Sequence, residues 1–572
     1  MSFFFHFQSE SKDELKIPDA ILYIESLANS DIVGVLKGFL MCGYDLDLQS
    51  IGNGENSCST LWNLNEDIVL VKAVNEWCHK FHQKHSKFQA AEFRWKTSNL
   101  SPKDLAVLAG KTIDEVRNRL QFLKCLNEVV FSQVLPTINF DSKQGLHTDF
   151  TALKTLLFTS GKNGYIHDLI DATVEKNDDQ PNVTVNLNPI ENIEKVSDDI
   201  ESTWFFQSYK VVSETPSNNF CIAMPSSDDP QYPMVIKMTG EEVQGNSGSF
   251  RQFMNTVLQE IHSTSLPLLM PYMGNGSFKG MYMLRPGPLQ ILNQKLLTHL
   301  GQLIGMALRA GIPLPLGLTP HFWKSMSKEE ITIQDLEDFD PDVESYLKQV
   351  ELVPSQEEFE DFLEDHQYPQ FLYQSITGVE TELCSDGKNI GLNYDNRLEF
   401  VDKFRQLRKQ ELECREHMNF IVIGMSTLVP FQILKGVYTS EELQSKICGA
   451  EGIDLYLLKK HTIYQVGLSE DDRHIQDFWQ ALFSLSPKQQ ILFLKFACNQ
   501  ERIPTPESNE NLPPPFPMKI APADAREEIQ DNLLIRAETC IFMVKVPRYS
   551  GFEVMREKLI YSICSADDPL SG

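Results

Sequence analysis

The chain has 572 residues, of which 42% are hydrophobic and 10% aromatic, and its formal net charge at pH 7 is -28. This length suffices for several domains with substantial cores. The acidic excess argues against a nucleic-acid partner, because nucleic-acid binding rests on basic contacts to phosphates. It suits a basic protein partner, although a solvated acidic surface is the simpler interpretation.

The cysteine pattern favours a reducing compartment. Eleven cysteines are scattered along the chain, and none forms a Cys-x-x-Cys pair. We therefore expect free thiols, a cytoplasmic location with the nucleus as the alternative, no metal site and no cofactor. The N-terminus lacks the basic region of a signal peptide. The longest apolar run, 420–434, is too short for a membrane span and contains Gly424 and Pro430, so no span is expected.

Residues 1–174 have the pattern of a helical region. Ile68, Val71 and Val74 recur at helical spacing, and Thr112 followed by Glu115 forms a capping box before another helical run. The simplest interpretation of these stripes is ordinary helix packing. Residues 175–203 are rich in Asp, Asn, Glu and Pro, which is typical of a linker.

From about Trp204 the pattern changes to mixed strand and helix. A strand is expected over 234–238, followed by a glycine-bearing loop and a helix from Ser247. The loop lacks the Walker lysine and the GxGxxG spacing, so it does not predict a nucleotide site. A strongly amphipathic helix over 296–308 ends at Gly311.

The last hundred residues begin after a short connector, Val466, Gly467 and Leu468, in which the glycine tolerates unusual backbone angles. A helix is then expected from Pro487, the first helical position after a Ser486 cap.

A strand is expected from Cys540 to Val546, with Cys540 where a loop enters it, and Pro547 ends this strand because proline cannot donate to a sheet. A helix follows from Phe552. A thiol at a loop–strand junction can be presented to a partner, but a lone cysteine is more often a small buried apolar residue.

The stretch around Cys540 resembles the active-site segment of the HECT family of ubiquitin ligases. That segment reads Leu-Pro-x-x-His-Thr-Cys-Phe before a strand, a Pro-x-Tyr turn and a last helix. Thr539-Cys540, Pro547 and Tyr549 match it, whereas Leu534-Ile535 replaces Leu-Pro and Glu538 replaces the histidine. Further matches follow in order from about Trp204 to Ile563. They include the runs 247–253, 335–341, 447–449, 478–479 and 501–504.

The resemblance implies an α+β, multi-domain chain, in which a helical N-terminal region precedes a bilobed HECT domain. Its parts are then a helical extension (1–174), an acidic, polar linker (175–203), a large N-lobe that binds a ubiquitin-conjugating enzyme (204–466) and a small C-lobe (467–572). Val466, Gly467 and Leu468 are the expected hinge.

The same resemblance implies that Cys540 accepts ubiquitin from the conjugating enzyme as a glycyl thioester and passes it to a substrate lysine. Thr539 is expected to hydrogen-bond near the thioester, and Glu538 to orient or deprotonate the incoming lysine. The implied partners are a conjugating enzyme, ubiquitin and protein substrates.

Two other functions compete with this one. The fold is compatible with a non-catalytic scaffold that binds ubiquitin or its conjugating enzyme, because the negative charge of Glu538 disfavours a neighbouring thiolate and no aromatic residue follows Tyr561. The helical N-terminal third, taken alone, is compatible with a protein-interaction module. The retained Thr539-Cys540 step favours the transferase over the scaffold.

Overall fold

A computed structural model describes residues 64–81, 102–108, 110–137, 153–174, 183–188, 200–222, 232–239, 246–263, 266–274, 276–364, 370–449, 452–465, 467–498, 500–503, 517–523 and 530–565. The chain divides into two compact units. The first comprises 1–166 with 436–438 and 506–510, and the second comprises 167–435, 439–505 and 511–572. The described residues mix helices with small sheets, so the chain is α+β.

The elements described between residues 64 and 172 are helical. They are α4 (Leu64–Phe81), α5 (Pro102–Leu108), α6 (Ile113–Val129), the π-helix η3 (Val130–Val134), the 3-10 turns η4 (Leu135–Thr137) and η5 (Lys154–Leu156), and α8 (Thr159–Ala172). The predicted capping box is confirmed, because the Thr112 side chain accepts from the Glu115 amide and Glu115 accepts from the Thr112 amide at 2.7 Å.

The middle of the chain carries most of the helices. Its elements are β1 (Thr184–Leu187), η7 (Ile200–Ser202), α9 (Trp204–Glu214), η8 (Ser217–Phe220), β2 (Val235–Met238), α10 (Asn246–Ile261), β3 (Leu269–Pro271), β4 (Tyr282–Leu284), α11 (Ile291–Ala310), α12 (Pro320–Ser327), α13 (Ile333–Phe339), α14 (Pro341–Leu352), α15 (Gln356–Glu364), β5 (Leu372–Gln374), β6 (Glu380–Glu382), η9 (Gly387–Asn389), α16 (Arg397–Glu413), α17 (Arg415–Ser426), α18 (Phe431–Val437) and α19 (Ser440–Cys448).

Strand β1 lies inside the segment 175–203 that we expected to be a linker. It pairs in parallel with β2, and Val185 and Leu187 are fully buried. The linker prediction is therefore wrong for residues 184–187. The alternation of apolar and polar residues over these four positions is a strand signal, which the polar composition on both sides outweighed.

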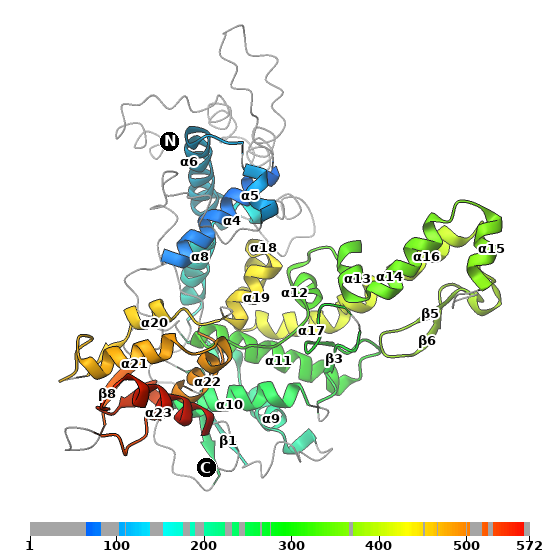
Figure 1. The fold of residues 1–572 in the computed structure, drawn as a ribbon. Helices are drawn as coiled ribbons and strands as arrows, with labels where there is room; N and C mark the ends of the chain where they lie inside the picture. The colour runs from blue at the N-terminus through cyan, green and yellow to red at the C-terminus, as the bar shows by residue number, and fades with distance from the viewer. Residues whose placement is uncertain are drawn as a thin grey trace. The chain divides into compact units, whose positions relative to one another are not determined.

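Helix α11 is the central helix of the second unit and packs against α17 (Figure 1). It ends at Gly311, whose φ of 64° is the left-handed conformation expected of a C-cap glycine. Two glycines allow the close crossing of α11 and α17. A Cβ on Gly301 would lie 2.0 Å from the carbonyl oxygen of Ile421, and a Cβ on Gly424 would lie 1.9 Å from that of Thr298.

The buried Arg309 of α11 holds the end of α8. Its guanidinium donates to the carbonyl oxygens of Leu428 and Ile222, each at 2.6 Å, and also to Thr173. Thr173 belongs to the stretch 1–174 that we predicted to be a separate extension. The last residues of that stretch, from residue 167 onward, therefore belong to the second unit.

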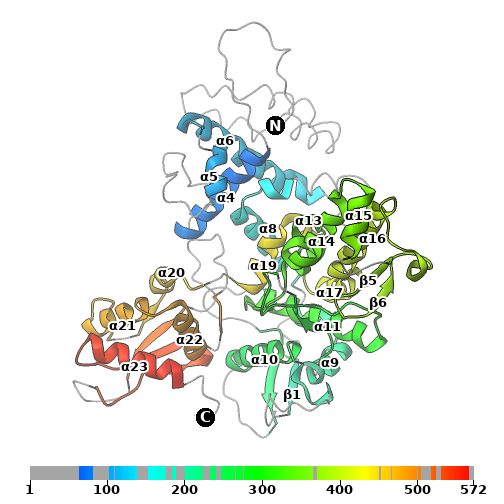
Figure 2. The same cartoon turned by 45° about the vertical axis from the view of Figure 1, so that its right-hand side comes forward.

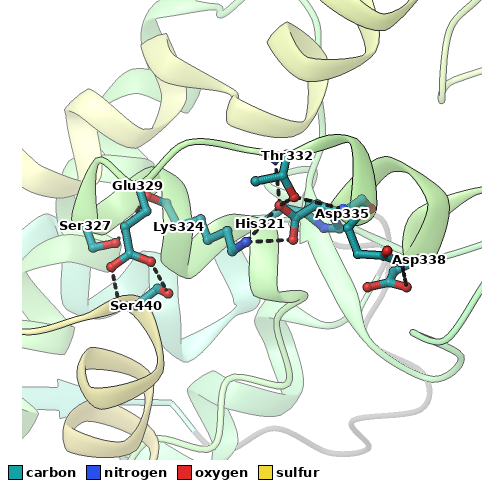
Figure 3. Close-up of polar contacts among 9 residues, drawn as sticks. His321, Lys324, Ser327, Glu329, Thr332, Asp335, Asp338 and Ser440 are labelled. Atoms are coloured by element: carbon teal, nitrogen blue, oxygen red, sulfur yellow. Dashed lines mark hydrogen bonds and ion pairs between the residues drawn. The ribbon is translucent and has the colours of Figure 1, made fainter. Parts of the chain in front are cut away.

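A polar cluster joins α12, α13 and α19 (Figure 3). The Lys324 ammonium lies 2.7 Å from Oδ1 of Asp335, whose carboxylate also accepts from the amide of Thr332 at the start of α13. The Glu329 carboxylate accepts from the amide and hydroxyl of Ser440. These groups satisfy one another, so the cluster has a structural role.

Helices α14, α15 and α16 and the hairpin β5–β6 lie together (Figure 2), and their buried side chains form a core of their own. The members of this core are Leu347, Val350, Phe359, Phe371, Tyr373, Leu383, Leu392, Phe400, Val401 and Phe404. The Glu344–Arg405 ion pair, with Arg405 Nε 3.0 Å from Glu344 Oε1, ties α14 to α16.

The end of the chain forms another separate core. Its elements are α20 (Leu455–Lys460), β7 (Ile463–Tyr464), α21 (Arg473–Phe483), α22 (Pro487–Cys498), β8 (Lys519–Pro522), β9 (Arg536–Glu538), η10 (Thr539–Ile541), β10 (Met543–Val546) and α23 (Phe552–Ser565). The sheet order is β7-β8-β10-β9, with β9 antiparallel to β10 and the other pairs parallel. Helix α22 begins at Pro487 after the Ser486 cap, as predicted.

This C-terminal core begins before the expected hinge. Leu455 and Leu458 of α20 are buried in it, and β7 belongs to its sheet. We expected the small lobe to begin at residue 467, whereas both elements lie N-terminal to that position. Apolar residues of α20 pack on α21, which extends the core backward along the chain.

No single helix among the described residues is long and apolar enough to cross a membrane, and only the bent pair 397–426 and 431–437, at 115°, meets the length and composition criteria jointly.

Candidate active site

Cys540 lies in a tight turn between two paired strands. Its backbone belongs to the 3-10 turn η10, between β9 and β10, and Met543 pairs with Glu538 across the hairpin. Our expectation that the strand starts at Cys540 is therefore wrong, because β10 begins at Met543. The interruption comes from Phe542, whose φ of 49° is left-handed and whose ring is buried in the C-terminal core.

Hydrogen bonds join the segment before β9 to the segment after β10. The Tyr549 hydroxyl donates to the carbonyl oxygen of Leu533 at 2.9 Å, and the amide of Arg548 donates to Oε1 of Gln530 at 3.0 Å. The predicted stop at Pro547 and the helix from Phe552 are confirmed. The segment after β10 is thus hydrogen-bonded to the segment that enters β9, which closes the end of the hairpin opposite the Cys540 turn.

Glu538, the residue that replaces the family's histidine, forms an ion pair. Its Oε1 lies 2.9 Å from Nζ of Lys545, which is on the facing strand β10. The charge that we expected to disfavour a thiolate is thus opposed by a nearby cation. The alternating pattern placed Lys545 on a strand, but it did not predict this partner.

Arg251 of α10 is a site residue to which the sequence gave us no role. It is 1% exposed, and its Nη2 donates to the carbonyl oxygen of Thr539 at 2.7 Å. The sequence feature that could have identified Arg251 is its position in the run 247–253, one of the segments that resemble the HECT family. Thr539 thus contributes its carbonyl group to the site, and the predicted role of its side chain stays a prediction.

Most other thiols that the structure describes are buried. Cys78, Cys221, Cys414, Cys448 and Cys498 are buried, whereas Cys564 is exposed and Cys384 is half-buried. Burial raises the pKa of Cys78, Cys414 and Cys498 to about 12, so these thiols stay protonated at neutral pH. Such thiols are poor nucleophiles.

The expected hinge is described in part. Val466 lies outside the described residues. Gly467 has a φ of 91° with open space where a Cβ would be, and Leu468 packs against the C-terminal core. Gly449 and Gly452, before α20, have similar φ values of 79° and 78°. The hinge therefore stays a prediction, with two glycine positions to compare.

A cavity of about 330 Å³ lies between α10 and α22. Asn255, Gln259 and His262 line it from α10, and Leu492 and Phe496 from α22. It lies along the same pair of helices that flank the Cys540 turn, and it marks where these helices are not fully packed. No group of three or more His, Cys, Asp or Glu side chains is arranged to hold a metal in the described part of the chain.

Comparisons with known proteins identify the family. Residues 181–568 match the model of the HECT-domain (ubiquitin-transferase) family. The chain is 34% identical over 582 residues to a human protein described as probable E3 ubiquitin-protein ligase HECTD4, covering 96% of this chain and 14% of that protein. It is 27% identical over 473 residues to human E3 ubiquitin-protein ligase HERC2, covering 78% and 9%.

A putative E3 ubiquitin-protein ligase of Plasmodium falciparum (isolate 3D7) is 26% identical over 277 residues, which are 47% of this chain and 3% of that protein. The chain thus spans a small part of the length of these relatives. The match extends through β1 and through the hairpin that carries Cys540, and most of the chain lies within it. The chain belongs to the HECT-domain (ubiquitin-transferase) family.

Proposed function

We propose that the chain is a HECT-type ubiquitin transferase that carries ubiquitin as a thioester on Cys540. The observation that carries this proposal is the position of Cys540 in a braced hairpin turn, inside a family match over residues 181–568. The chain covers only 14% of the human relative HECTD4, so substrates and partners are also proposals.

The proposed chemistry has two steps. The Cys540 thiolate attacks the carbonyl carbon of the thioester that joins ubiquitin to its conjugating enzyme, and the enzyme's thiolate leaves as the new C–S bond forms. A substrate amine then attacks the same carbonyl carbon, the C–S bond to Cys540 breaks, and the amine loses a proton. Thiol–thioester exchange is nearly balanced, so the site mainly supplies proximity and a thiolate.

In this proposal, the two steps of ubiquitin transfer take place in a domain with two lobes. The C-terminal core from Leu455 onward is separate from the core of the α14–α16 body, which favours a small lobe that reorients as a body. We propose a large N-lobe, a C-lobe that contains Cys540, and a helical N-terminal region. Val466–Leu468 is the proposed hinge, and the connection around Gly452 is the alternative.

The body formed by α14–α16 and β5–β6 is the proposed docking site of the conjugating enzyme. It presents three large apolar side chains to solvent, namely Leu352, Val379 and Leu398, which are 76%, 60% and 50% exposed. A bound partner would remove the apolar surface of these side chains from water. Helix α15 adds acidic residues, which suit a basic partner.

A charging assay tests the function. Full-length chain is incubated with activating enzyme, a panel of conjugating enzymes and labelled ubiquitin, and the products are resolved with and without reductant. Wild type is expected to form a reductant-labile adduct, and Cys540→Ala is expected to form none. Cys540→Ser is expected to trap a reductant-stable ester, because an oxygen ester resists thiols. Cys564→Ala, at an exposed cysteine of α23, is the control and is expected to charge normally.

Normal charging of Cys540→Ala, or no labile adduct on wild type with any conjugating enzyme, would support the non-catalytic scaffold instead. We also propose a cytoplasmic location, which suits the described free thiols. Imaging of a tagged full-length chain tests that location.

A further inference from the structure

The carbonyl oxygen of Thr539 accepts two hydrogen bonds of unequal quality. The amide of Phe542, which closes the 3-10 turn, is 3.5 Å away, whereas Nη2 of Arg251 is 2.7 Å away. The first distance is at the limit of a hydrogen bond, and the second is that of a charge-assisted one. The turn therefore depends more on Arg251 than on its own internal bond.

The peptide bond that accepts from Arg251 is the one that enters Cys540. The Thr539 carbonyl carbon is bonded to the Cys540 amide nitrogen, so the guanidinium is hydrogen-bonded to the peptide group that precedes the proposed nucleophile. Arg251 is 1% exposed, so water screens its charge weakly.

Three parts of the structure next to the Cys540 turn carry charged side chains, namely α10, α22 and the hairpin itself. Helix α10 supplies Arg251, with Glu260 near its other end, and α22 supplies Lys488 and Lys495. The hairpin supplies Arg536, Glu538 and Lys545. Glu538 is paired with Lys545, and Lys495 is paired with Glu501 at 2.9 Å, while Glu260 accepts from backbone amides. Among these groups, Arg251 is the one whose side chain donates to the backbone of the turn.

Arg251 also acts on a second thiol. Its charge lowers the pKa of Cys498 in α22, although burial is the larger effect there and raises that pKa overall. The Arg251 guanidinium thus lowers the pKa of Cys498 and also contacts the Cys540 turn.

We propose that Arg251 is a positioning residue for Cys540. It holds the turn through the Thr539 carbonyl while α10 and the hairpin are in contact, and it places a buried positive charge against the peptide group that precedes Cys540, which favours the thiolate. This inference rests on the proposed function in one respect only, namely that Cys540 is the acceptor of ubiquitin.

The reactivity of the thiol tests the proposal without ubiquitin. The rate of alkylation by iodoacetamide is measured across pH on the full chain, and peptides are quantified by mass spectrometry. Trypsin releases Cys540 in the peptide 537–545 and Cys564 in the peptide 559–572, so each thiol is followed separately. Cys564 is exposed on α23 and serves as the internal control.

Arg251→Met is expected to raise the midpoint of the Cys540 profile by about one pH unit, which is about a tenfold loss of thiolate at neutral pH. Arg251→Lys keeps the charge but loses the planar fork, so a smaller shift is expected. Lys495→Met removes a cation from α22 that is paired elsewhere, and is expected to leave the midpoint unchanged. Arg251→Met is also expected to slow ubiquitin charging, with partial rescue by Arg251→Lys.

An Arg251→Met midpoint equal to that of wild type would overturn the proposal. So would an equal shift of Cys540 and Cys564, which would indicate a general disturbance of the fold. If the Cys540 midpoint shifts as expected but wild type forms no ubiquitin adduct, the positioning role stands and the proposed function fails.

Discussion

Arg251 and Thr539 are 288 residues apart in the chain, yet the guanidinium of the first donates to the carbonyl oxygen of the second at 2.7 Å. The bond joins α10 to the turn that holds Cys540. A change in α10 can therefore alter the chemistry of a cysteine that no local pattern connects with it.

The Glu538–Lys545 pair is expected to protect the thiol from a neighbouring negative charge. Lys545→Met leaves Glu538 without this cation, so charging of Cys540 at neutral pH is expected to slow by about two- to fivefold. Adding Glu538→Gln is expected to restore the rate. The side chains of Lys545 and Glu538 are 23% and 46% exposed, so the slowing of charging should be smaller at high salt.

Initial rates of thioester formation at two ionic strengths measure the effect of Lys545→Met, and Lys545→Arg is the charge-preserving control. A double variant as slow as Lys545→Met would indicate that Lys545 acts on something other than Glu538.

The position of the hinge is open to a direct comparison of two glycines. Proline fixes φ near −65°, whereas Gly467 and Gly452 have φ values of 91° and 78°. Gly467→Pro is expected to slow discharge of ubiquitin to substrate more than charging, because the lobes must reorient between the steps. Single-turnover pulse–chase experiments measure both rates.

Gly452→Pro is the matched variant. At Gly452 and at Gly467 alike, a Cβ atom would have no atom of a non-adjacent residue within 4 Å. If it slows discharge while Gly467→Pro leaves both rates unchanged, the hinge precedes α20. That outcome would agree with the inclusion of Leu455 in the C-terminal core.

Gly301 is expected to be essential for the packing of α11 on α17. A methyl group there would lie 2.0 Å from a backbone oxygen of Ile421, so Gly301→Ala must push the helices apart. A loss of about 1–3 kcal/mol in the free energy of unfolding is expected. Gly164→Ala, in open space within α8, is the control and should be neutral or stabilising. Urea denaturation measures both, and equal stabilities would contradict the observed crossing.

Glu260 gives the second unit a predictable pH dependence. Its carboxylate accepts from the amides of Trp204 and Phe205 at 2.7 and 2.8 Å, yet burial, the largest cause, raises its pKa from 4.5 to about 7. The folded state therefore holds this proton more tightly than the unfolded state. The resulting stabilisation is complete below about pH 4.5 and is lost as the pH rises through about 7.

Glu260→Gln is expected to remove this part of the pH dependence, and to lower stability at acidic pH because one of the two amides loses its acceptor oxygen. Unfolding free energies of both proteins at about pH 5 and about pH 8 measure the difference. Parallel pH profiles for wild type and Glu260→Gln would show that the carboxyl group titrates normally.

Local patterns in the sequence predicted several of the elements that the structure describes. The capping boxes at Thr112 and Ser486, the end of α11 at Gly311 and the stop at Pro547 are confirmed, because each depends on residues within one turn of one another. Cys540 was identified by the ordered matches to the family, because the local pattern alone favours a buried cysteine.

The tertiary structure decided what depends on distant contacts. Phe542 adopts a left-handed backbone as its ring enters the core, and this converts the expected start of a strand into a turn. Residues 184–187 form a strand because β2, about fifty residues later, pairs with them. Arg251 meets Thr539 for the same reason: a hydrogen bond across 288 residues leaves no periodic trace in the sequence, and only the packing of α10 against the hairpin brings the two groups together.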